Sequence, residues 1–509
     1  MSSPFDIFDQ LSVAETQGDS ATATPKPPEP TIERRLASVE RLPAARSSRP
    51  SPEVPDPVIT ARAMCADPNR RAYFGARGAV YLSDLAHDFA RCFDSHIRRG
   101  QDGIWVYSHG VWSPVGDTGS MVLAALMGDD WSAALEERVL AFIARQPAFP
   151  TTMNDPRSDG WWNWVNFTNG HYEWTTDRLV PHSPERLSTW QLTVPFRPGP
   201  APMWVQFLQE VLPADMLAPD ANGVAPWQED LGYLLLPGNP LHSAFLLRGA
   251  GRNGKGVYMS VVQAISGRTS GVSLEDIASP DRSRFRTYDL YGSPLSICGE
   301  IDPRYMRDTA TFKALTGDDP MQFERKFGKP FTARSWATLV FSANKDFRAS
   351  DNSVAFWDRW QVRSFPNYIP DHQRDPGLGE RLFREEGPQI AALAMAGLRN
   401  LMTRGRFVET SSSADVKRRF RMHSDHVGRF IDERCRFTSV AKDTTTRAQL
   451  LEAYKQWCGD EQERFPVRAT ELYEAVRSAA VLSGIPENRI ERKVQGTRGF
   501  GHLSIEDRS

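Results

Sequence analysis

The stretch Ser243-Ala-Phe-Leu-Leu-Arg-Gly-Ala-Gly-Arg-Asn-Gly-Lys-Gly256 decides the fold of this chain. An apolar run gives way to glycines, and a segment of helical spacing follows from about Val257 to Ile265. Glycines permit backbone angles at which successive N–H groups face phosphate oxygens, and the lysine adds a positive charge beside them. The pattern predicts a strand, a loop that binds the phosphates of ATP, and a helix whose positive dipole end faces the same anion. The predicted loop comprises Gly249, Ala250, Gly251, Arg252, Asn253, Gly254, Lys255 and Gly256.

One position departs from the usual phosphate-loop pattern. The residue after the lysine is Gly256, where a serine or threonine ordinarily stands. The hydroxyl that would bind Mg²⁺ is therefore missing, and the metal must rely on other groups. An ordinary glycine-rich turn is the alternative interpretation, and the apolar strand before the loop counts against it.

Composition and charge limit the classes of protein. The chain has 509 residues, 40% of them hydrophobic and 24% charged, which suits about three domains with their own cores. The net charge of −2 means that any contact with nucleic acid must come from local basic patches. We expect a cytoplasmic protein without a membrane partner, because no long apolar run is present and Asp6 and Asp9 stand where a signal peptide needs positive charge. The cysteines lack C-x-x-C spacing, so no structural metal is expected, and they are Cys65, Cys92, Cys298, Cys435 and Cys458.

The order of composition and periodicity predicts the domains. Residues 1–60 are rich in Pro, Ser, Thr and Ala and are expected to be a disordered tail. A mixed α/β domain is expected at 61–200, with a helix through Leu85 and Phe89, a turn at Asn169-Gly170 and a proline-punctuated linker from Pro181. The aromatic residues between 161 and 174 could stack on bases, but core packing is favoured. The remaining expected segments are 201–380 for a helical collar plus the nucleotide domain, 381–430 for a helical connector and 431–509 for a winged helix.

Two further strands are predicted to end in residues suited to nucleotide hydrolysis. Leu295 to Gly299 ends at Glu300, with Asp302 two residues on, and acids at such a position hold Mg²⁺ and activate water. Ala337 to Ala343 ends at Asn344, whose amide could orient the attacking water. Taken singly, an acid can simply cap a strand and an asparagine can simply be a turn residue. Three strands that each end in a suitable residue favour the catalytic interpretation.

These motifs resemble the superfamily 3 helicases and, more narrowly, the phage and plasmid primase-helicase family with its poxvirus relatives. The resemblance covers roughly residues 160–380 and reaches upstream to NFTNGHYEW and PHSPERLST. It rests on GAGRNGKGV, Glu300, LTGDDPMQFERKFGKPF (315–331), LVFSAN ending at Asn344, and DNSVAFWDRW (351–360) leading into SFPN.

The resemblance implies an AAA+-like fold that assembles as a ring, usually a hexamer. It implies that Lys255 binds phosphate, that Glu300 works with Mg²⁺ and water, and that Asn344 is the sensor. Arg359 is the implied arginine finger, which stabilises the transition state only when two subunits are docked, with Arg363 a weaker substitute. Because Gly256 has no hydroxyl, Glu300, Asp302 and the phosphate oxygens would carry more of the magnesium ligation.

Two basic segments are candidate DNA contacts. The segment between Asp319 and Phe331 is expected to form a hairpin that points into the ring channel, where its cations follow a phosphate backbone; a solvated loop is the alternative. Its basic residues are Arg325, Lys326 and Lys329.

Near the C-terminus, a capping box at Thr446 and Gln449, a helix from Ala469 to Val481 and a basic hairpin predict a winged helix. Its groove helix would carry Arg468 and Arg477, and its wing would carry Arg492, Lys493 and Arg498. A winged helix that binds protein is the alternative. The basic run from Lys417 to Arg421 is expected to be a solvated helix face.

The combined prediction is a ring-forming, ATP-dependent DNA helicase of a phage or mobile element, active in the host cytoplasm during replication. It would move along single-stranded DNA and also contact duplex DNA. The main alternative is an origin-binding or assembly protein in which nucleotide acts only as a switch, which Gly256 favours; a nucleotide hydrolase acting on RNA or in packaging is a third. The chain shows neither a D-x-D carboxylate pair nor a zinc cluster, so we expect no primer synthesis and a separate primase as a possible partner.

Overall fold

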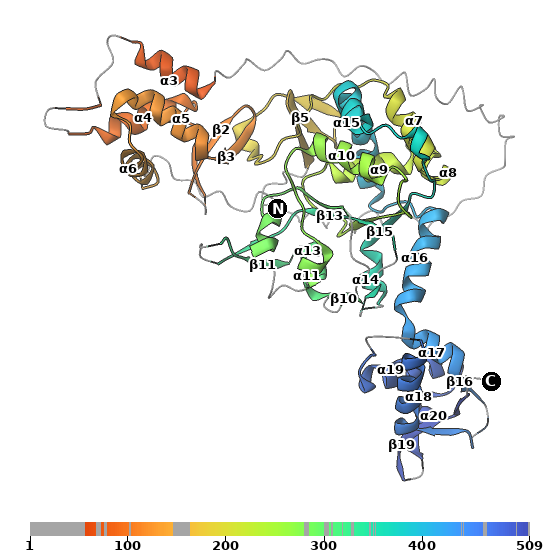
Figure 1. Ribbon diagram of the computed structural model, residues 1–509. Helices are drawn as coiled ribbons and strands as arrows, with labels where there is room; N and C mark the ends of the chain where they lie inside the picture. The colour runs from red at the N-terminus through yellow and green to blue at the C-terminus, as the bar shows by residue number, and fades with distance from the viewer. Residues whose placement is uncertain are drawn as a thin grey trace, which may run out of the picture.

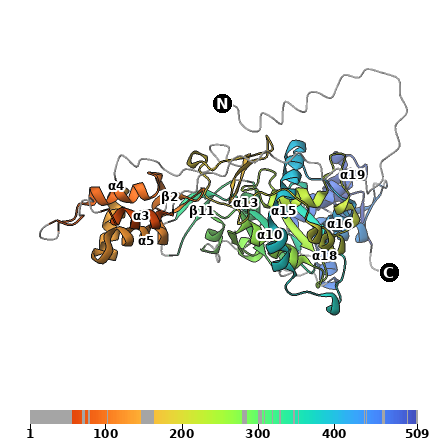
Figure 2. The ribbon, with the colours of Figure 1, turned by 90° about the horizontal axis from the view of Figure 1, so that it is seen from above.

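The computed structural model shows three parts (Figure 1): an N-terminal unit, a central unit around a sheet, and a C-terminal unit that α16 (Ser411–Ser424) joins to the centre. Viewed from above, the N-terminal unit lies to one side of the central unit (Figure 2). The structure describes residues 56–67, 73–75, 79–100, 103–145, 163–278, 285–299, 305–306, 309–317, 319–326, 330–345, 348–349, 351, 353–438, 440, 442–461, 466–494 and 496–506.

The N-terminal unit is a helical cluster beside a three-stranded antiparallel sheet. Residues 1–55 of the predicted tail lie outside the described residues, and order begins earlier than expected, because Asp56 caps a helix that already includes residues 57–60. The predicted helix through Leu85 and Phe89 is confirmed, and both residues are fully buried. The strands at Gly103–Ser108 and Val111–Pro114 pair as an antiparallel hairpin. The elements are α3 (Pro57–Cys65), α4 (Leu82–Cys92), β1 (Ile97–Gly100), β2 (Gly103–Ser108), β3 (Val111–Pro114), α5 (Gly116–Met127) and α6 (Ala133–Ile143).

The segment from 163 to 200 packs onto the central unit. Its three strands form one antiparallel sheet: β4 (Trp164–Phe167), β5 (Gly170–Glu173) and β6 (Arg178–Val180). Phe167 pairs with Gly170, so the turn residues are Thr168 and Asn169, one position before the predicted turn. The expected linker is wrong as well, because alternate residues within it are buried in the core of the central unit, namely Trp190, Leu192 and Val194.

The aromatic residues of this segment fill a core, as favoured from the sequence. Phe167 and Tyr172 are buried, and the Tyr172 ring stacks on Phe196. Trp161 and Trp162 lie outside the described residues.

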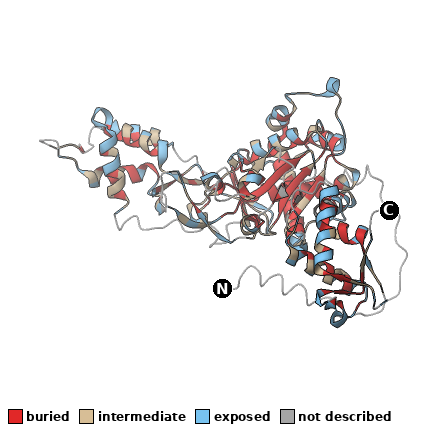
Figure 3. Cartoon of the chain, turned by 60° about the horizontal axis from the view of Figure 1, so that its bottom comes forward, coloured by how far each residue is buried: buried red, intermediate tan, exposed pale blue. Residues whose placement is uncertain are grey.

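The central unit contains a five-stranded, wholly parallel sheet in the order β15-β7-β13-β9-β8. Its inner strands are mostly apolar, because helices cover both faces of the sheet. Figure 3 shows the buried sheet. The strands are β7 (Ala244–Arg248), β8 (Thr269–Ser270), β9 (Leu295–Cys298), β13 (Thr338–Ala343) and β15 (Trp360–Ser364).

The two faces of the sheet contribute to two separate cores. Phe245 and Leu247 face one core, whereas Leu246 faces the other, as the alternation of a strand requires. The first core is covered by α7 (Pro202–Val211), α9 (Pro226–Leu234), α10 (Lys255–Ser266) and α15 (Leu378–Arg404). The second is covered by α11 (Leu274–Ala278), α13 (Ala310–Thr316), α14 (Val354–Asp358) and α16.

The helices α9 and α15 pack so closely that their backbones are in contact. A Cβ at Gly397 would lie 2.1 Å from the Gln228 carbonyl carbon, and a Cβ at Gly232 would lie 2.3 Å from the Ala394 carbonyl oxygen. The lack of side chains at these two glycines therefore allows α9 to pack directly against α15.

The C-terminal unit confirms several local predictions. The capping box of Thr446 and Gln449 opens α18, because each side chain bonds the backbone N–H of the other. The predicted second helix and hairpin are α19 and the β18–β19 pair. The elements are α17 (His426–Arg434), β16 (Cys435–Phe437), β17 (Thr444–Thr446), α18 (Arg447–Asp460), α19 (Ala469–Leu482), α20 (Glu487–Ile490), β18 (Glu491–Val494), β19 (Thr497–Gly501) and β20 (Leu503–Ile505). Across the described ranges, no helix combines the length and apolar character needed to cross a membrane.

Candidate functional site

The predicted phosphate loop connects the carboxyl end of β7 to α10. Gly251 and Gly254 have φ values of +100° and +82°, and Arg252 adopts +52°, so the loop turns through left-handed conformations that favour glycine. At Gly249, a Cβ would lie 1.9 Å from Asn253 Nδ2 and 2.5 Å from the carbonyl oxygen of Phe365. The loop is therefore drawn tightly against the end of β15.

Lys255 begins α10 and points back into the loop. Its side-chain ammonium donates hydrogen bonds to the Gly249 carbonyl oxygen at 2.7 Å, to Asn253 Oδ1 at 3.0 Å and to Asn344 Oδ1 at 3.1 Å. The residue is only 5% exposed. Three oxygen acceptors thus hold the positive charge inside the loop.

Asn344 reaches the loop because β13 lies directly beside β7. Ala343 pairs with Arg248, and the Gly249 N–H donates to the Ala343 carbonyl oxygen at 3.1 Å. The next residue, Asn344, then stands at the same edge of the sheet as the lysine. The structure brings together two of the predicted site residues that are 89 positions apart in the sequence.

Asn253 has a bridging role that its place in the loop pattern did not reveal. Its Nδ2 donates to the Phe365 carbonyl oxygen at 3.1 Å while its Oδ1 accepts from Lys255. The asparagine therefore links the lysine to the strand on the other side of the loop.

Arg359 lies at the opposite, amino edge of the sheet. Its carbonyl oxygen accepts from the Ala244 N–H at 2.7 Å, and Trp360 pairs with Ala244. The length of β7, roughly 16 Å for five residues, separates that position from the loop. The Nη1 atom of Arg359 donates a hydrogen bond to the Ala355 carbonyl oxygen of α14. Arg359 therefore does not join the site that Lys255 and Asn344 form within one chain.

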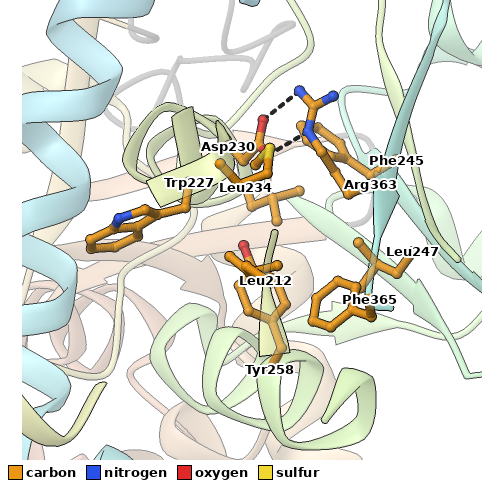
Figure 4. Close-up of a pocket in the computed structure, with 10 residues that line it drawn as sticks. Leu212, Trp227, Asp230, Leu234, Phe245, Leu247, Tyr258, Arg363 and Phe365 are labelled. Carbon is orange, nitrogen blue, oxygen red and sulfur yellow. Dashed lines mark hydrogen bonds and ion pairs between the residues drawn. The ribbon is translucent and has the colours of Figure 1, made fainter. Parts of the chain in front are cut away.

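The interpretation of Arg363 as a substitute finger is wrong. Its side chain is 5% exposed and forms a two-pronged ion pair with Asp230 of α9, with Nε–Oδ2 at 2.6 Å and Nη2–Oδ1 at 2.7 Å. Burial opposes the charge, but the adjacent carboxylate outweighs it and raises the pKa of Arg363. Figure 4 shows this pair at a small apolar cavity that Tyr258 and Phe365 also line. Sequence reasoning missed Asp230 altogether.

The predicted magnesium ligands Glu300 and Asp302 lie outside the described residues. Gly256 is exposed, and a Cβ added there would meet no atom within 4 Å. The described ranges hold no group of three or more His, Cys, Asp or Glu side chains placed to bind a metal. The described loop thus supplies backbone and the lysine, but no protein ligand for Mg²⁺ at the position that usually carries a hydroxyl.

The predicted basic hairpin between Asp319 and Phe331 is present. Its strands β11 (Pro320–Phe323) and β12 (Phe331–Arg334) pair antiparallel, and their phenylalanines pack beside Tyr291. Arg325 and Lys326 are exposed at its turn. Lys329 lies outside the described residues.

The basic hairpin of the C-terminal unit exposes all three predicted cations. Lys493 pairs directly across from Arg498, and Arg492 lies one position before Lys493 on β18. By contrast, Arg477 of the expected groove helix bonds Glu491, and this contact lowers the pKa of the carboxylate. Its guanidinium is already paired within the protein, whereas Arg468 at the start of α19 is exposed.

The basic run on α16 is divided. Phe420 is buried against the second core, Arg418 pairs with Asp415, and Lys417 Nζ lies 3.9 Å from Asp358. Arg418 and Arg419 lie on the exposed side of the helix, as a solvated face requires, whereas Lys417 is half-buried.

A parallel sheet with a lysine-bearing loop between β7 and α10 is consistent with a P-loop NTPase core. Two family models match the chain: residues 99–213 match the model described as D5 N terminal like, and residues 247–359 match a family of unknown function, DUF5906. Such domains are typical of phage and plasmid primase-helicases, so the resemblance to that D5-like superfamily 3 group is confirmed.

Solved structures of the C-terminal region of NrS-1 without ligand also match. One is 13% identical over 81% of this chain and 98% of that one, with a TM-score of 0.39. A second is 11% identical over 81% of this chain and 97% of that one, with a TM-score of 0.41.

Proposed function

We propose that the chain is an ATP-dependent DNA helicase that assembles into a ring and moves along single-stranded DNA during replication of a phage or mobile element. The observation that carries the proposal is the convergence of Lys255 and Asn344 at the mouth of the loop. An ammonium group and an amide placed together there serve to bind a terminal phosphate and to orient a water molecule against it.

The strand order supports an AAA+-like core within this proposal. Counted along the chain, β7 is the first strand of the sheet and β13 is the fourth, and they lie side by side with β15 on the other flank. The strand that ends at Asn344 is thereby inserted between the loop strand and β9, after which Glu300 follows in the sequence.

The chemistry assigned to each residue follows from its position. An incoming triphosphate offers Lys255 anionic oxygens that compete with the neutral oxygens of Gly249, Asn253 and Asn344. In this proposal the ammonium moves to phosphate and the Asn344 amide orients the attacking water. Mg²⁺, when bound with ATP, neutralises charge on the phosphate oxygens; Glu300 and Asp302 are its proposed protein ligands. Arg359 is too far from its own loop, so we assign it to the nucleotide of an adjacent subunit.

DNA contact is proposed at two places. Exposed Arg325 and Lys326 at the β11–β12 turn, with Lys329, would follow a phosphate backbone in the channel of a ring, which we expect to be hexameric. The C-terminal unit is proposed to be a winged helix whose hairpin cations contact duplex DNA. These wing residues are Arg492, Lys493 and Arg498. A separate primase is the proposed partner for primer synthesis.

The test is steady-state ATP hydrolysis with and without single-stranded DNA, on wild-type protein and on Lys255→Ala and Arg359→Ala, with oligomer size measured in parallel. Stimulation by DNA, and its loss in both variants while assembly persists, supports the motor. Unwinding of a forked DNA duplex, compared with an RNA duplex, then separates DNA from RNA substrates.

Gly256 favours a second candidate, in which nucleotide only switches a DNA-binding protein between states. That protein would bind ATP in a Lys255-dependent manner and change its assembly or DNA affinity without repeated turnover. Multiple-turnover hydrolysis excludes it.

A further inference from the structure

The segment that follows β15 is tied to the outer side of the phosphate loop. The Phe365 N–H donates to the Arg248 carbonyl oxygen at 2.7 Å, and the Ile369 N–H donates to the Arg252 carbonyl oxygen at 2.8 Å. Asn367 Nδ2 anchors the same segment to the Glu210 carbonyl oxygen of α7 at 2.8 Å. The backbone from 365 to 369 is thus held between the phosphate loop and α7.

Arg252 joins the loop to this segment through its side chain as well. Its Nη1 lies 3.0 Å from Asp371 Oδ1 and donates to the Tyr368 hydroxyl at 3.2 Å. The backbone of Arg252 has a φ of +52°, a left-handed conformation that residues other than glycine rarely adopt. Asp371 Oδ1 accepts from Arg252 and also from Arg374, so these contacts link the Arg252 side chain to the segment after β15.

Tyr368 is unusual among the residues of this segment because its ring is largely exposed. Its hydroxyl is bonded, yet the residue is 60% exposed, so most of the ring faces solvent at the rim of the loop. An aromatic ring contributes to stability mainly by burying area, and this one buries little. A ring fixed by its hydroxyl and left open on its face suits a flat partner that arrives with a ligand.

We propose that Tyr368 stacks on the base of the nucleotide whose phosphates occupy the loop. This assignment rests on the proposed function, because it takes the loop as the site of the triphosphate. The arrangement explains why Arg252 is drawn away from the loop interior: it sets the height and tilt of the ring. Stacking accepts any base, since every base has a π-face, so Tyr368 adds affinity without strong selection among nucleotides.

The test compares two ligands, one that carries a base and one that consists of phosphates alone. ATP and inorganic tripolyphosphate are titrated by calorimetry into wild-type protein, Tyr368→Ala and Tyr368→Phe. We expect Tyr368→Ala to weaken ATP binding about 10-fold and to leave tripolyphosphate binding unchanged. Tyr368→Phe, which keeps the ring but loses the hydrogen bond to Arg252, should weaken ATP binding less than Tyr368→Ala does and should also leave tripolyphosphate binding unchanged. Tyr81→Ala, which removes a partly exposed tyrosine at the start of α4 in the N-terminal unit, is the matched control.

Three results would overturn the assignment. One is unchanged ATP affinity in Tyr368→Ala; another is an equal loss for tripolyphosphate, which would make Tyr368 a support of the loop. The third is a loss of single-stranded DNA binding, measured without nucleotide, in place of the ATP effect. Lys255→Ala separates this inference from the proposed function, because failure of that variant to weaken either ligand would count against the loop as the phosphate site whatever Tyr368 does.

Discussion

The Oδ1 atom of Asn344 lies 3.1 Å from Nζ of Lys255, so the amide proposed to orient water already engages the lysine proposed to bind phosphate. The lysine thereby occupies one of the two lone pairs of that oxygen. Under the proposed roles, nucleotide binding rearranges this contact, and the two side chains should give different phenotypes when removed.

Asn344→Ala should lower the rate of ATP hydrolysis about 10²-fold with ATP affinity unchanged or slightly increased, because Lys255 loses an acceptor that competes with phosphate. Lys255→Ala should lose binding itself. Equilibrium binding and single-turnover hydrolysis separate the two effects. Asn222→Ala is the control with the same chemical change, since that exposed amide bonds Asn400 and does not touch the lysine. Loss of ATP affinity in Asn344→Ala would contradict the assigned division of labour.

Gly256→Ser should lower the Mg²⁺ concentration needed for half-maximal ATP hydrolysis several-fold. The added Cβ meets no atom within 4 Å, and the hydroxyl would stand where such loops usually present a ligand to the metal. Gly254→Ser is the control with the same chemical change: there φ is +82° and the Cβ would lie 2.5 Å from Val211 Cγ1, so the loop should be damaged. A Mg²⁺ titration that is identical for wild-type and Gly256→Ser would show that the hydroxyl is not a ligand in this loop.

Arg359→Ala should lower turnover about 10³-fold or more without weakening ATP binding by the same subunit, because Arg359 lies at the far edge of the sheet from its own loop. A mixing experiment tests whether the arginine acts between subunits. Arg359→Ala and Lys255→Ala proteins are each inactive alone, but random co-assembly of equal amounts should restore roughly a quarter of the sites, in which an intact loop faces an intact arginine. The absence of any recovery in co-assembled rings would place the required arginine elsewhere.

The ion pair of Asp230 and Arg363 should behave as a structural unit. Asp230→Ala alone leaves a buried guanidinium without its partner and should lower the free energy of unfolding by about 3–5 kcal/mol. The combined Asp230→Leu and Arg363→Met protein should recover most of that loss, because well-packed apolar side chains can replace a buried pair. Urea unfolding of Asp230→Leu, of Arg363→Met and of the combined variant gives the coupling energy. Additive losses would mean that the two groups are independent.

The parts of this molecule that were predictable from sequence are those that local patterns encode. An apolar run that breaks into glycines and a lysine defines β7, the loop and α10 within 24 residues, 243–266. Asn344 was found in the same way, because a buried strand ends immediately before it. The capping box of Thr446 and Gln449 required only four consecutive residues.

The predictions that failed concern residues whose contacts are distant in sequence. Asp230 lies within a helix and resembles a surface acid until its partner, 133 positions away, is known. Arg363 was considered a finger because its motif does not state which way a strand residue points. The segment around Trp190 was interpreted as a linker from its prolines, although apolar residues at 190, 192 and 194 alternate as a packed extended segment requires.

The buried His171 should make stability depend on pH. Burial, reinforced by the charges of His182 and Arg186, lowers the pKa of His171 to about 3, so the folded protein holds this ring neutral while the unfolded chain protonates near pH 6.5. Between these two pKa values the unfolded state binds more protons, and the free energy of unfolding falls as the pH falls. At pH 5 the loss relative to pH 7.5 is about 2 kcal/mol. Urea unfolding at a series of pH values should show a flatter profile for His171→Phe than for wild-type, whereas replacement of the exposed His372 by asparagine should leave the profile intact. If His171→Phe retains the full pH dependence, protons are taken up at other groups on unfolding and the neutral buried ring is not their source.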